Sequence, residues 1–130
     1  MNLGHRIWVF PDGDLPPLDP YDPSLKRIET HGHESLVVLN AGSKQVNPIL
    51  RVYFSDREPW TLALAPIAPE RVCCYRMDEP VGVEKRTIPP GQYALVLECD
   101  YPVIAQIGRM DIRQPNLAYY TAIGFPSDPS

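Results

Sequence analysis

The sequence predicts a single all-β domain, a β-sandwich of jelly-roll character. Six or more short apolar runs are separated by turn residues, a pattern typical of sandwiches and barrels. The sixteen prolines of this 130-residue chain disfavour long helices. Because the length is that of one ordinary domain, we treat residues 1–130 as a single domain, with a loop rich in proline and aspartate at 11–24 and a short tail at 126–130.

The first two expected strands are separated by a long loop. Residues 6–10 form an apolar run that the Pro-Asp-Gly-Asp sequence at 11–14 is expected to stop. Five prolines and four aspartates in 11–24 favour an extended loop without ladder hydrogen bonds. Residues 35–39 are expected to form a strand buried on both faces, which turn residues at 40–42 close.

The middle of the chain carries the clearest strand signal. In 49–54, the apolar residues Leu50, Val52 and Phe54 alternate with residues suited to solvent, as in a strand with one buried face. A turn follows, and two further strands are expected at 60–64 and 71–77. The apolar run 60–68 is also a candidate interface between copies of the chain, because an isolated sandwich must protect its edge strands.

Two apolar runs in the last third of the chain, 93–99 and 103–110, flank a turn signal at 100–102. Aspartate and proline in that turn predict that the two runs pair as a hairpin. A final short strand is expected at 119–125, and at most one helical turn at 114–120 precedes it.

The second of these runs leads into a cluster of charged residues. Along a continuing strand, Arg109, Asp111 and Arg113 would share one face, because side chains alternate. Two guanidinium groups around a carboxylate form either a structural ion-pair ladder or the rim of a polar binding site. The sequence leaves both alternatives open.

Aromatic and planar polar residues in the same chain support a small-molecule site. Aromatic faces together with amide, carboxylate and guanidinium groups suit a sugar or another small polar ligand. The candidate ligand-binding residues are Trp8, Asn40, Tyr93, Gln106, Arg109, Asp111, Arg113 and Gln114. Of these, Asn40 also fits a simple turn former, whereas Gln106, between apolar neighbours, is expected to be a buried amide with hydrogen-bonding partners.

Charge and hydropathy argue against several other classes of protein. A net charge of −4 and a pI near 5.3 disfavour non-specific binding to nucleic acid. No window holds the roughly 20 apolar residues of a membrane span, and the N-terminus lacks the features of a secretory signal, so we expect a cytoplasmic protein. The three cysteines, Cys73, Cys74 and Cys99, suit that compartment as free, core-filling residues.

Motifs for metal binding or catalysis are incomplete. His31 and His33 have the spacing of two ligands on one strand face, but Glu34 follows immediately and would point away. Asp56 and Glu58 belong to a turn, and no Gly-x-Ser-x-Gly motif is present. We therefore expect no metal, no cofactor and no enzymatic activity.

Four parts of the chain together resemble a known family: Trp8, 33–42, 53–59 and 102–114. Their order and spacing are similar to those of the sensory rhodopsin transducer family, which comprises the small soluble partner of a cyanobacterial sensory rhodopsin and its bacterial relatives. The resemblance implies an eight-stranded jelly-roll sandwich that assembles as a homotetramer and binds small molecules, proposed to be sugars. The residues that match the family pattern are Trp8, His33, Glu34, Asn40, Tyr53, Ser55, Asp56, Glu58, Arg76, Gln106, Arg109, Asp111, Arg113 and Gln114.

Two functions follow as hypotheses. The first is a non-enzymatic binding module in which Arg109, Asp111 and Arg113 hold a small polar ligand while Trp8 or Tyr93 stacks on it. The second is an adaptor that docks the cytoplasmic face of a membrane receptor of rhodopsin type, whose positive charge suits an acidic protein. Replacing Arg109 with alanine would distinguish the two alternatives for the charged cluster. The variant would lose stability if Arg109 forms a structural ion pair, whereas it would fold normally and lose ligand binding if Arg109 belongs to a binding site.

Overall fold

The computed structural model describes residues 3–15, 33–111 and 118–128. Strands account for the regular secondary structure of these segments, and the pairings between them are antiparallel. In chain order they are β1 (His5–Leu15), β2 (His33–Asn40), β3 (Ile49–Phe54), β4 (Trp60–Ala63), β5 (Arg71–Arg76), β6 (Gly91–Asp111), β7 (Ala118–Ile123) and β8 (Phe125–Pro126). The predicted all-β class is confirmed.

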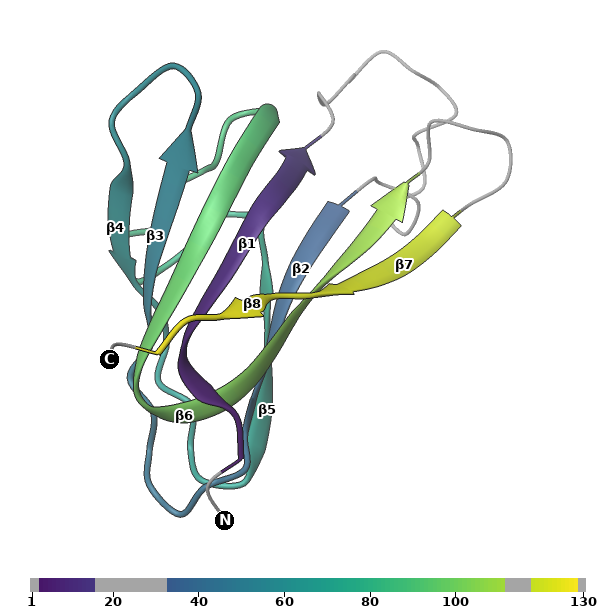
Figure 1. The fold of residues 1–130 in the computed structure, drawn as a ribbon. Helices are drawn as coiled ribbons and strands as arrows, with labels where there is room; N and C mark the ends of the chain where they lie inside the picture. The colour runs from purple at the N-terminus through teal and green to yellow at the C-terminus, as the bar shows by residue number, and fades with distance from the viewer. Residues whose placement is uncertain (1–2, 16–32, 112–117, 129–130) are drawn as a thin grey trace.

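Two sheets share the long strand β6, which curves from one sheet into the other (Figure 1). In the first sheet the strand order is β4-β3-β6-β1-β8. In the second sheet β5 pairs with β2, β2 with the C-terminal part of β6, and β6 with β7. Side chains of both sheets meet in one core, among them Leu50 and Leu97 from the first sheet and Leu36 from the second, all 0 % exposed. This arrangement is the predicted β-sandwich.

The predicted hairpin in the last third of the chain is wrong, because 93–99 and 103–110 belong to the single strand β6. Near the bend of this strand, its register with β1 shifts between His5 and Ile7. Pro102 lies in that irregular stretch, where its missing N–H costs no ladder hydrogen bond. The proline therefore marks the passage from one sheet to the other and not a chain reversal.

Side chains of β1 complete the hydrogen bonding at this bend. The Arg6 Nε donates to the Cys99 carbonyl at 3.1 Å, and the Trp8 indole Nε1 donates to the Val103 carbonyl at 2.9 Å. Buried carbonyl groups need such partners, because an unpaired one costs about as much as a lost hydrogen bond. Trp8, only 5 % exposed, is therefore held in the core by its ring and its N–H.

Strand β1 is longer than predicted, since the Pro-Asp-Gly-Asp sequence at 11–14 continues it to Leu15. A second register shift, between Phe10 and Gly13, absorbs these irregular residues. Gly13 is needed for close packing, because a Cβ at this position would lie 2.5 Å from the Tyr93 ring. The loop prediction is therefore wrong for this part of the chain, and the rest of the predicted loop lies outside the described residues.

Burial follows the prediction in one strand and departs from it in another. Along β3, Leu50 and Val52 are 0 % exposed and alternate with exposed residues, as predicted. Along β2, Leu36 and Val38 are 0 % exposed, but Leu39 is 39 % exposed. The prediction that this strand is buried on both faces is therefore wrong, because β2 lies in an antiparallel sheet whose outer face meets solvent.

The apolar run 60–68 fills the chain's own core. Leu62, Leu64 and Ile67 are 0 %, 3 % and 2 % exposed. A backbone bridge between Val46 and Ile67 holds the end of this run in place. These large side chains are therefore not available to an interface between copies of the chain.

The three cysteines differ in burial, although all are free thiols. Cys99 is 1 % exposed, and Cys73 packs against the core from β5. Cys74 is exposed on the opposite face of the same strand, so the prediction of a core-filling residue is wrong for this cysteine.

The final apolar run, 119–125, is divided between β7 and β8. β8 turns back to the first sheet, where it pairs with β1 through Trp8 and Val9. Of the helical turn allowed at 114–120, residues 118–120 are strand, and the others lie outside the described residues.

Candidate functional site

The charged group that the sequence singles out surrounds a buried carboxylate, that of Glu34. This residue is 0 % exposed. Its Oε1 accepts from the Tyr93 hydroxyl at 2.7 Å and from the Asp14 backbone N–H at 2.8 Å, and its Oε2 accepts from Arg109 Nε at 2.6 Å. Three donors from β1 and from both halves of β6 therefore satisfy one carboxylate. We call Glu34, Tyr93 and Arg109 the Glu34–Arg109 cluster.

Strand register explains how residues distant in sequence meet here. Inward-facing positions on β2 continue from Leu36 to Glu34, so the carboxylate points into the sandwich. The ladder pairs Glu34 with Arg109 and pairs Arg109 with Tyr120 on β7. The three side chains therefore form one row across β2, β6 and β7.

Each nitrogen of the Arg109 guanidinium group donates a hydrogen bond to a described residue. Its Nη1 donates to the Tyr120 hydroxyl at 2.6 Å, and its Nη2 donates to the Asp12 carbonyl at 3.3 Å. Burial lowers the pKa of Arg109, but the hydrogen bond and charge of Glu34 raise it by more, so the pKa is raised overall. Burial and the Glu34 charge likewise raise the pKa of Tyr93, which keeps its hydroxyl proton as a donor. For Arg109, these contacts correspond to the structural ion-pair alternative.

The other predicted site residues whose side chains the structure describes, Trp8, Asn40 and Gln106, are not gathered into one site. Trp8 and Tyr93 are core residues. Asn40 is 1 % exposed, and its Nδ2 donates to the carbonyls of Lys44, Ile67 and Ala68, while its Oδ1 accepts from Gly42 N–H. This amide closes the turn after β2, and its four hydrogen bonds leave little for a ligand.

Gln106 is exposed on the outer face of the second sheet, so the prediction of a buried amide is wrong. Its apolar neighbours Ala105 and Ile107 are buried because alternate residues of a strand face opposite sides. The Asp111 backbone pairs with Ala118, but its side chain lies outside the described part of the structure. Arg113 and Gln114 lie outside the described residues altogether.

The histidine motif does not assemble a metal centre in the part of the chain that the structure describes. His31 lies outside the described residues, and His33 is partly buried at the start of β2. The carboxylate of Glu34, the third candidate ligand of the motif, already accepts hydrogen bonds from Tyr93 and Arg109. No group of three or more histidine, cysteine, aspartate or glutamate side chains suited to a metal ion occurs among the described residues.

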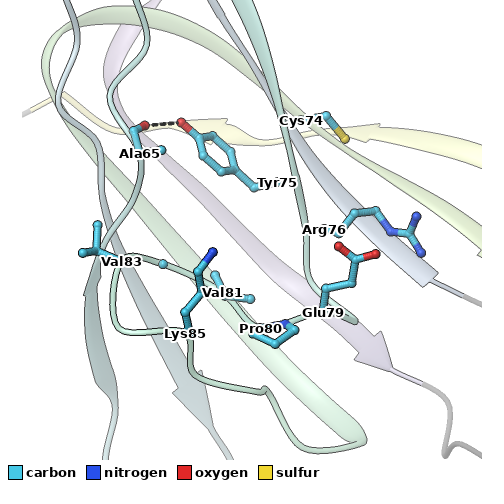
Figure 2. A pocket seen from close by; sticks show the side chains of 10 residues that line it. Ala65, Cys74, Tyr75, Arg76, Glu79, Pro80, Val81, Val83 and Lys85 are labelled. Atoms are coloured by element: carbon cyan, nitrogen blue, oxygen red, sulfur yellow. Dashed lines mark hydrogen bonds between the residues drawn. The ribbon is translucent and has the colours of Figure 1, made fainter.

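A pocket that the sequence did not indicate lies beside β5 (Figure 2). Its volume is about 420 Å³, within the range of small-molecule sites. The residues that line it are Ala65, Cys74, Tyr75, Arg76, Glu79, Pro80, Val81, Gly82, Val83 and Lys85. We call this the β5 pocket.

Backbone hydrogen bonds fix the segment 77–86, which forms most of the β5 pocket. The Met77 N–H donates to the Glu34 carbonyl at 2.8 Å, and the Val83 N–H donates to the Ala63 carbonyl at 2.9 Å. Val81 and Arg86 form a two-way backbone bridge at 2.7 and 3.0 Å. The walls are therefore ordered without a ligand.

Some polar side chains of the β5 pocket bind other groups of the chain, and others have no ion-pair partner among the described residues. Both Arg76 Nε and Nη2 donate to the Asp78 carboxylate at 2.7 Å, and this bond raises the pKa of Arg76. The Tyr75 hydroxyl donates to the Ala65 carbonyl at 2.7 Å, the dashed line in Figure 2. The exposed side chains of Glu79 and Lys85 make no ion pair with any described residue.

The sequence contains only weak signals for this pocket. Pro80 and Gly82 mark a turn, but many turns in the chain are marked in the same way. The pocket arises because β5 is paired on one side by β2 and the following segment folds beside it.

Comparisons with known proteins agree with this fold. The family model described as Anabaena sensory rhodopsin transducer matches residues 3–126. The crystal structure of Thermotoga maritima 1070 matches with a TM-score of 0.79 and 28 % sequence identity, covering 100 % of both chains. The Anabaena sensory rhodopsin transducer matches with a TM-score of 0.72 and 24 % identity, covering 87 % of this chain and 94 % of that chain, which shows the fold alone. No curated protein matches the sequence. The described segments contain no helix with the length and apolar character needed to cross a membrane.

Proposed function

Because the chain belongs to the Anabaena sensory rhodopsin transducer family, we propose that it is a cytoplasmic, non-enzymatic signalling domain that binds a small polar ligand, such as a sugar. The observation that carries this proposal is the β5 pocket of about 420 Å³. It combines an apolar wall with charged side chains that have no ion-pair partner among the described residues. Ligand sites are typically apolar clefts with a few convergent polar groups.

The location of this proposed site differs from the one that the sequence suggested. The Glu34–Arg109 cluster uses its hydrogen-bonding groups internally, and a ligand there would have to replace a 2.6 Å ion pair in a buried site. The contributions of Asp111, Arg113 and Gln114 to ligand binding remain predictions.

A second candidate function, a protein-interaction adaptor, is supported by the outer face of the second sheet. Val72, Leu39 and Ile104 pair in one row across β5, β2 and β6 and are 63 %, 39 % and 40 % exposed. Ile123 on β7 is 79 % exposed on the next row. Contiguous exposed apolar side chains favour a protein partner, here a receptor of rhodopsin type or the other subunits of a homotetramer.

A thermal-shift screen against sugars, sugar acids and nucleotides tests the ligand proposal. A ligand at about 100 times its Kd stabilises the folded state by about 2.7 kcal/mol. The variant Cys74→Trp should abolish the shift, because its ring would fill the β5 pocket from an exposed position. Val72→Trp, on the same face of β5 but outside the pocket, is the matched control.

The adaptor is tested by capture from native membranes with the wild-type chain and with Val72→Asp, which places a charge on the exposed apolar row. If the wild-type chain captures a membrane receptor and the variant does not, the adaptor function is supported.

In the ligand screen, a thermal shift that persists in Cys74→Trp would indicate that the ligand binds outside the β5 pocket.

A further inference from the structure

Strand β5 has one free edge among the described residues, because it pairs with β2 on one side and with no described strand on the other. The Met77 N–H donates to the Glu34 carbonyl, and the register of β5 with β2 stays constant from there to Arg71. In an antiparallel ladder, residues that bond to the partner strand alternate with residues that do not. The main-chain N–H and C=O groups that point away from β2 are therefore those of Val72, Cys74 and Arg76.

These outward main-chain groups make no hydrogen bond with another described residue. The edge of β4 differs, because its Ala63 carbonyl accepts from the Val83 N–H at 2.9 Å. Proteins usually protect a free edge with proline, lysine, a bulge or a covering segment. β5 has a regular register and contains neither proline nor lysine. Its edge is therefore open to an added strand.

The β5 pocket lies along this free edge, since Cys74, Tyr75 and Arg76 line one side of it. In Figure 2, Val83 and Lys85 lie on the opposite side. Neighbouring strands of a sheet lie about 4.8 Å apart. A strand added to β5 would therefore run through the pocket, whose volume is about 420 Å³.

An added strand would direct every second side chain into the pocket. Tyr75 faces the interior, like its ladder partner Leu36. A residue opposite Tyr75 on the added strand would face the same way. It would lie between the half-buried Tyr75 ring and Val83, whose side chain is 67 % exposed. An apolar side chain suits this position, because it would remove apolar surface from water.

The charges of the pocket favour an acidic residue beside that apolar one. The hydrogen bond of Asp78, together with the charges of Asp78 and Glu79, raises the pKa of Arg76, so both carboxylates act on this arginine. Lys85 makes no ion pair with any described residue. It lies toward the end of the pocket formed by Pro80, where the chain has left β5 (Figure 2). A carboxylate at that end of the added strand would complement it.

We propose that the free edge of β5 binds an extended peptide segment of a partner protein, which adds an antiparallel strand to the second sheet. Val72, Cys74 and Arg76 exchange main-chain hydrogen bonds with the segment. An apolar residue of the segment lies opposite Tyr75, and an acidic residue two positions before it pairs with Lys85. The segment occupies the same pocket as the small ligand of the proposed function but does not depend on that ligand.

Titration calorimetry with the heptapeptide acetyl-Thr-Asp-Thr-Leu-Thr-Val-Thr-amide tests this inference. When its leucine lies opposite Tyr75, the N–H of its fifth residue points at Cys74 and the N–H of its sixth residue points away. N-methylation of the fifth residue should weaken binding by about tenfold or more, because it removes a hydrogen bond and places a methyl group against β5. N-methylation of the sixth residue is the matched control and should leave the Kd unchanged.

Variants of the protein test the same contacts from the other side. Cys74→Pro removes an N–H that β2 does not use, so the chain should fold and bind the peptide about tenfold or more weakly. Val83→Asp should also weaken binding, and Ile123→Asp, at an exposed position of β7, is its matched control. Lys85→Gln should weaken binding about threefold, but not for a peptide in which asparagine replaces the aspartate.

Absence of peptide binding, or binding that N-methylation of the fifth residue leaves intact, overturns the inference. The methylated peptides give this answer even if Cys74→Pro fails to fold. If a sugar binds in the pocket and the peptide does not bind, the proposed function stands and the peptide site fails. If the peptide binds with the expected dependence and no small ligand binds, the peptide site stands and the proposed ligand fails.

Discussion

The Glu34–Arg109 cluster and the β5 pocket use the same three residue types in opposite ways. In the cluster, Glu34, Arg109 and Tyr93 bind one another, and the carboxylate is 0 % exposed. In the pocket, Glu79 is exposed, while the arginine and tyrosine bind other groups of the chain.

The difference between these regions shows that residue type does not distinguish a structural site from a binding site. A buried carboxylate loses its water, so it persists only with donors around it. Once these donors are in place, the group has little capacity left for a ligand. An exposed charge keeps its water and can exchange it for a ligand at small cost.

The largest effect is expected from breaking the cluster. Arg109→Met should leave the Glu34 charge buried without its ion-pair partner and reduce the free energy of unfolding by about 3–5 kcal/mol. Urea unfolding followed by circular dichroism measures this loss. Arg51→Met, an exposed arginine over the Tyr53 ring, is the control and should cost about 1 kcal/mol or less. If the two variants have equal urea midpoints, Arg109 is not a structural ion-pair partner, and the alternative that it belongs to a ligand site holds.

A smaller loss is expected at the turn after β2. Asn40→Ala removes a side chain that makes four hydrogen bonds, so the free energy of unfolding should fall by about 2–3 kcal/mol. The same urea series measures it. Asn47→Ala, at an exposed amide that binds Asp100, should cost about half as much or less. If Asn40→Ala is neutral, the turn does not depend on this amide, and Asn40 again becomes available to a ligand.

A substitution in the β5 pocket should increase the free energy of unfolding instead of reducing it. Lys85→Gly relieves the left-handed backbone conformation and should raise the free energy of unfolding by up to about 1 kcal/mol. Thermal unfolding without ligand measures the gain, with Lys44→Gly as the control at a second exposed lysine. A clear loss in Lys85→Gly would mean that the lysine side chain supports the fold.

Chemical labelling of the thiols should distinguish the buried Cys99 from Cys74 in the β5 pocket, without any change in stability. Burial raises the pKa of Cys99 to about 12, so this thiol stays protonated and unreactive up to about pH 9. Exposed Cys74 should react rapidly with a disulfide reagent over the same range. Mass spectrometry after brief labelling identifies the modified residue, and unfolded protein is the control in which all three react. Protection of Cys74 by a ligand would place that ligand in the β5 pocket.

The smallest effect is expected at the end of the chain. A hydrogen bond from His5 and others from the Arg6 and Ile7 N–H groups lower the pKa of Asp128. A lowered carboxylate pKa contributes stability above its usual value near 4, and this contribution is lost as the pH falls through the lowered pKa. The Ser127 N–H donates to the Ile7 carbonyl at 3.0 Å, and the protection of this amide from hydrogen exchange, relative to an unfolded chain at the same pH, should therefore fall below about pH 4. The variant Asp128→Asn should lack that fall and show lower protection already at neutral pH.

The sequence by itself determined the local features of this protein. Alternation in 49–54 predicted which face of β3 is buried, because neighbouring side chains on a strand point to opposite sides. Asn40 before Ala41 and Gly42 predicted a turn, and the structure adds its hydrogen bonds. The spacing of several motifs predicted the family and, with it, the sandwich.

Only the tertiary structure decided which partner each residue meets. Glu34 and Arg109 lie 75 residues apart, and the register of β2 with β6 brings them together. Pro102 marked a turn by its type, but the pairing of β6 with strands of both sheets made it a bend. The β5 pocket likewise depends on where the segment after β5 folds. Turns and alternation are set by neighbours along the chain, whereas pairing, burial of charge and pocket shape depend on segments that only the folded core brings together.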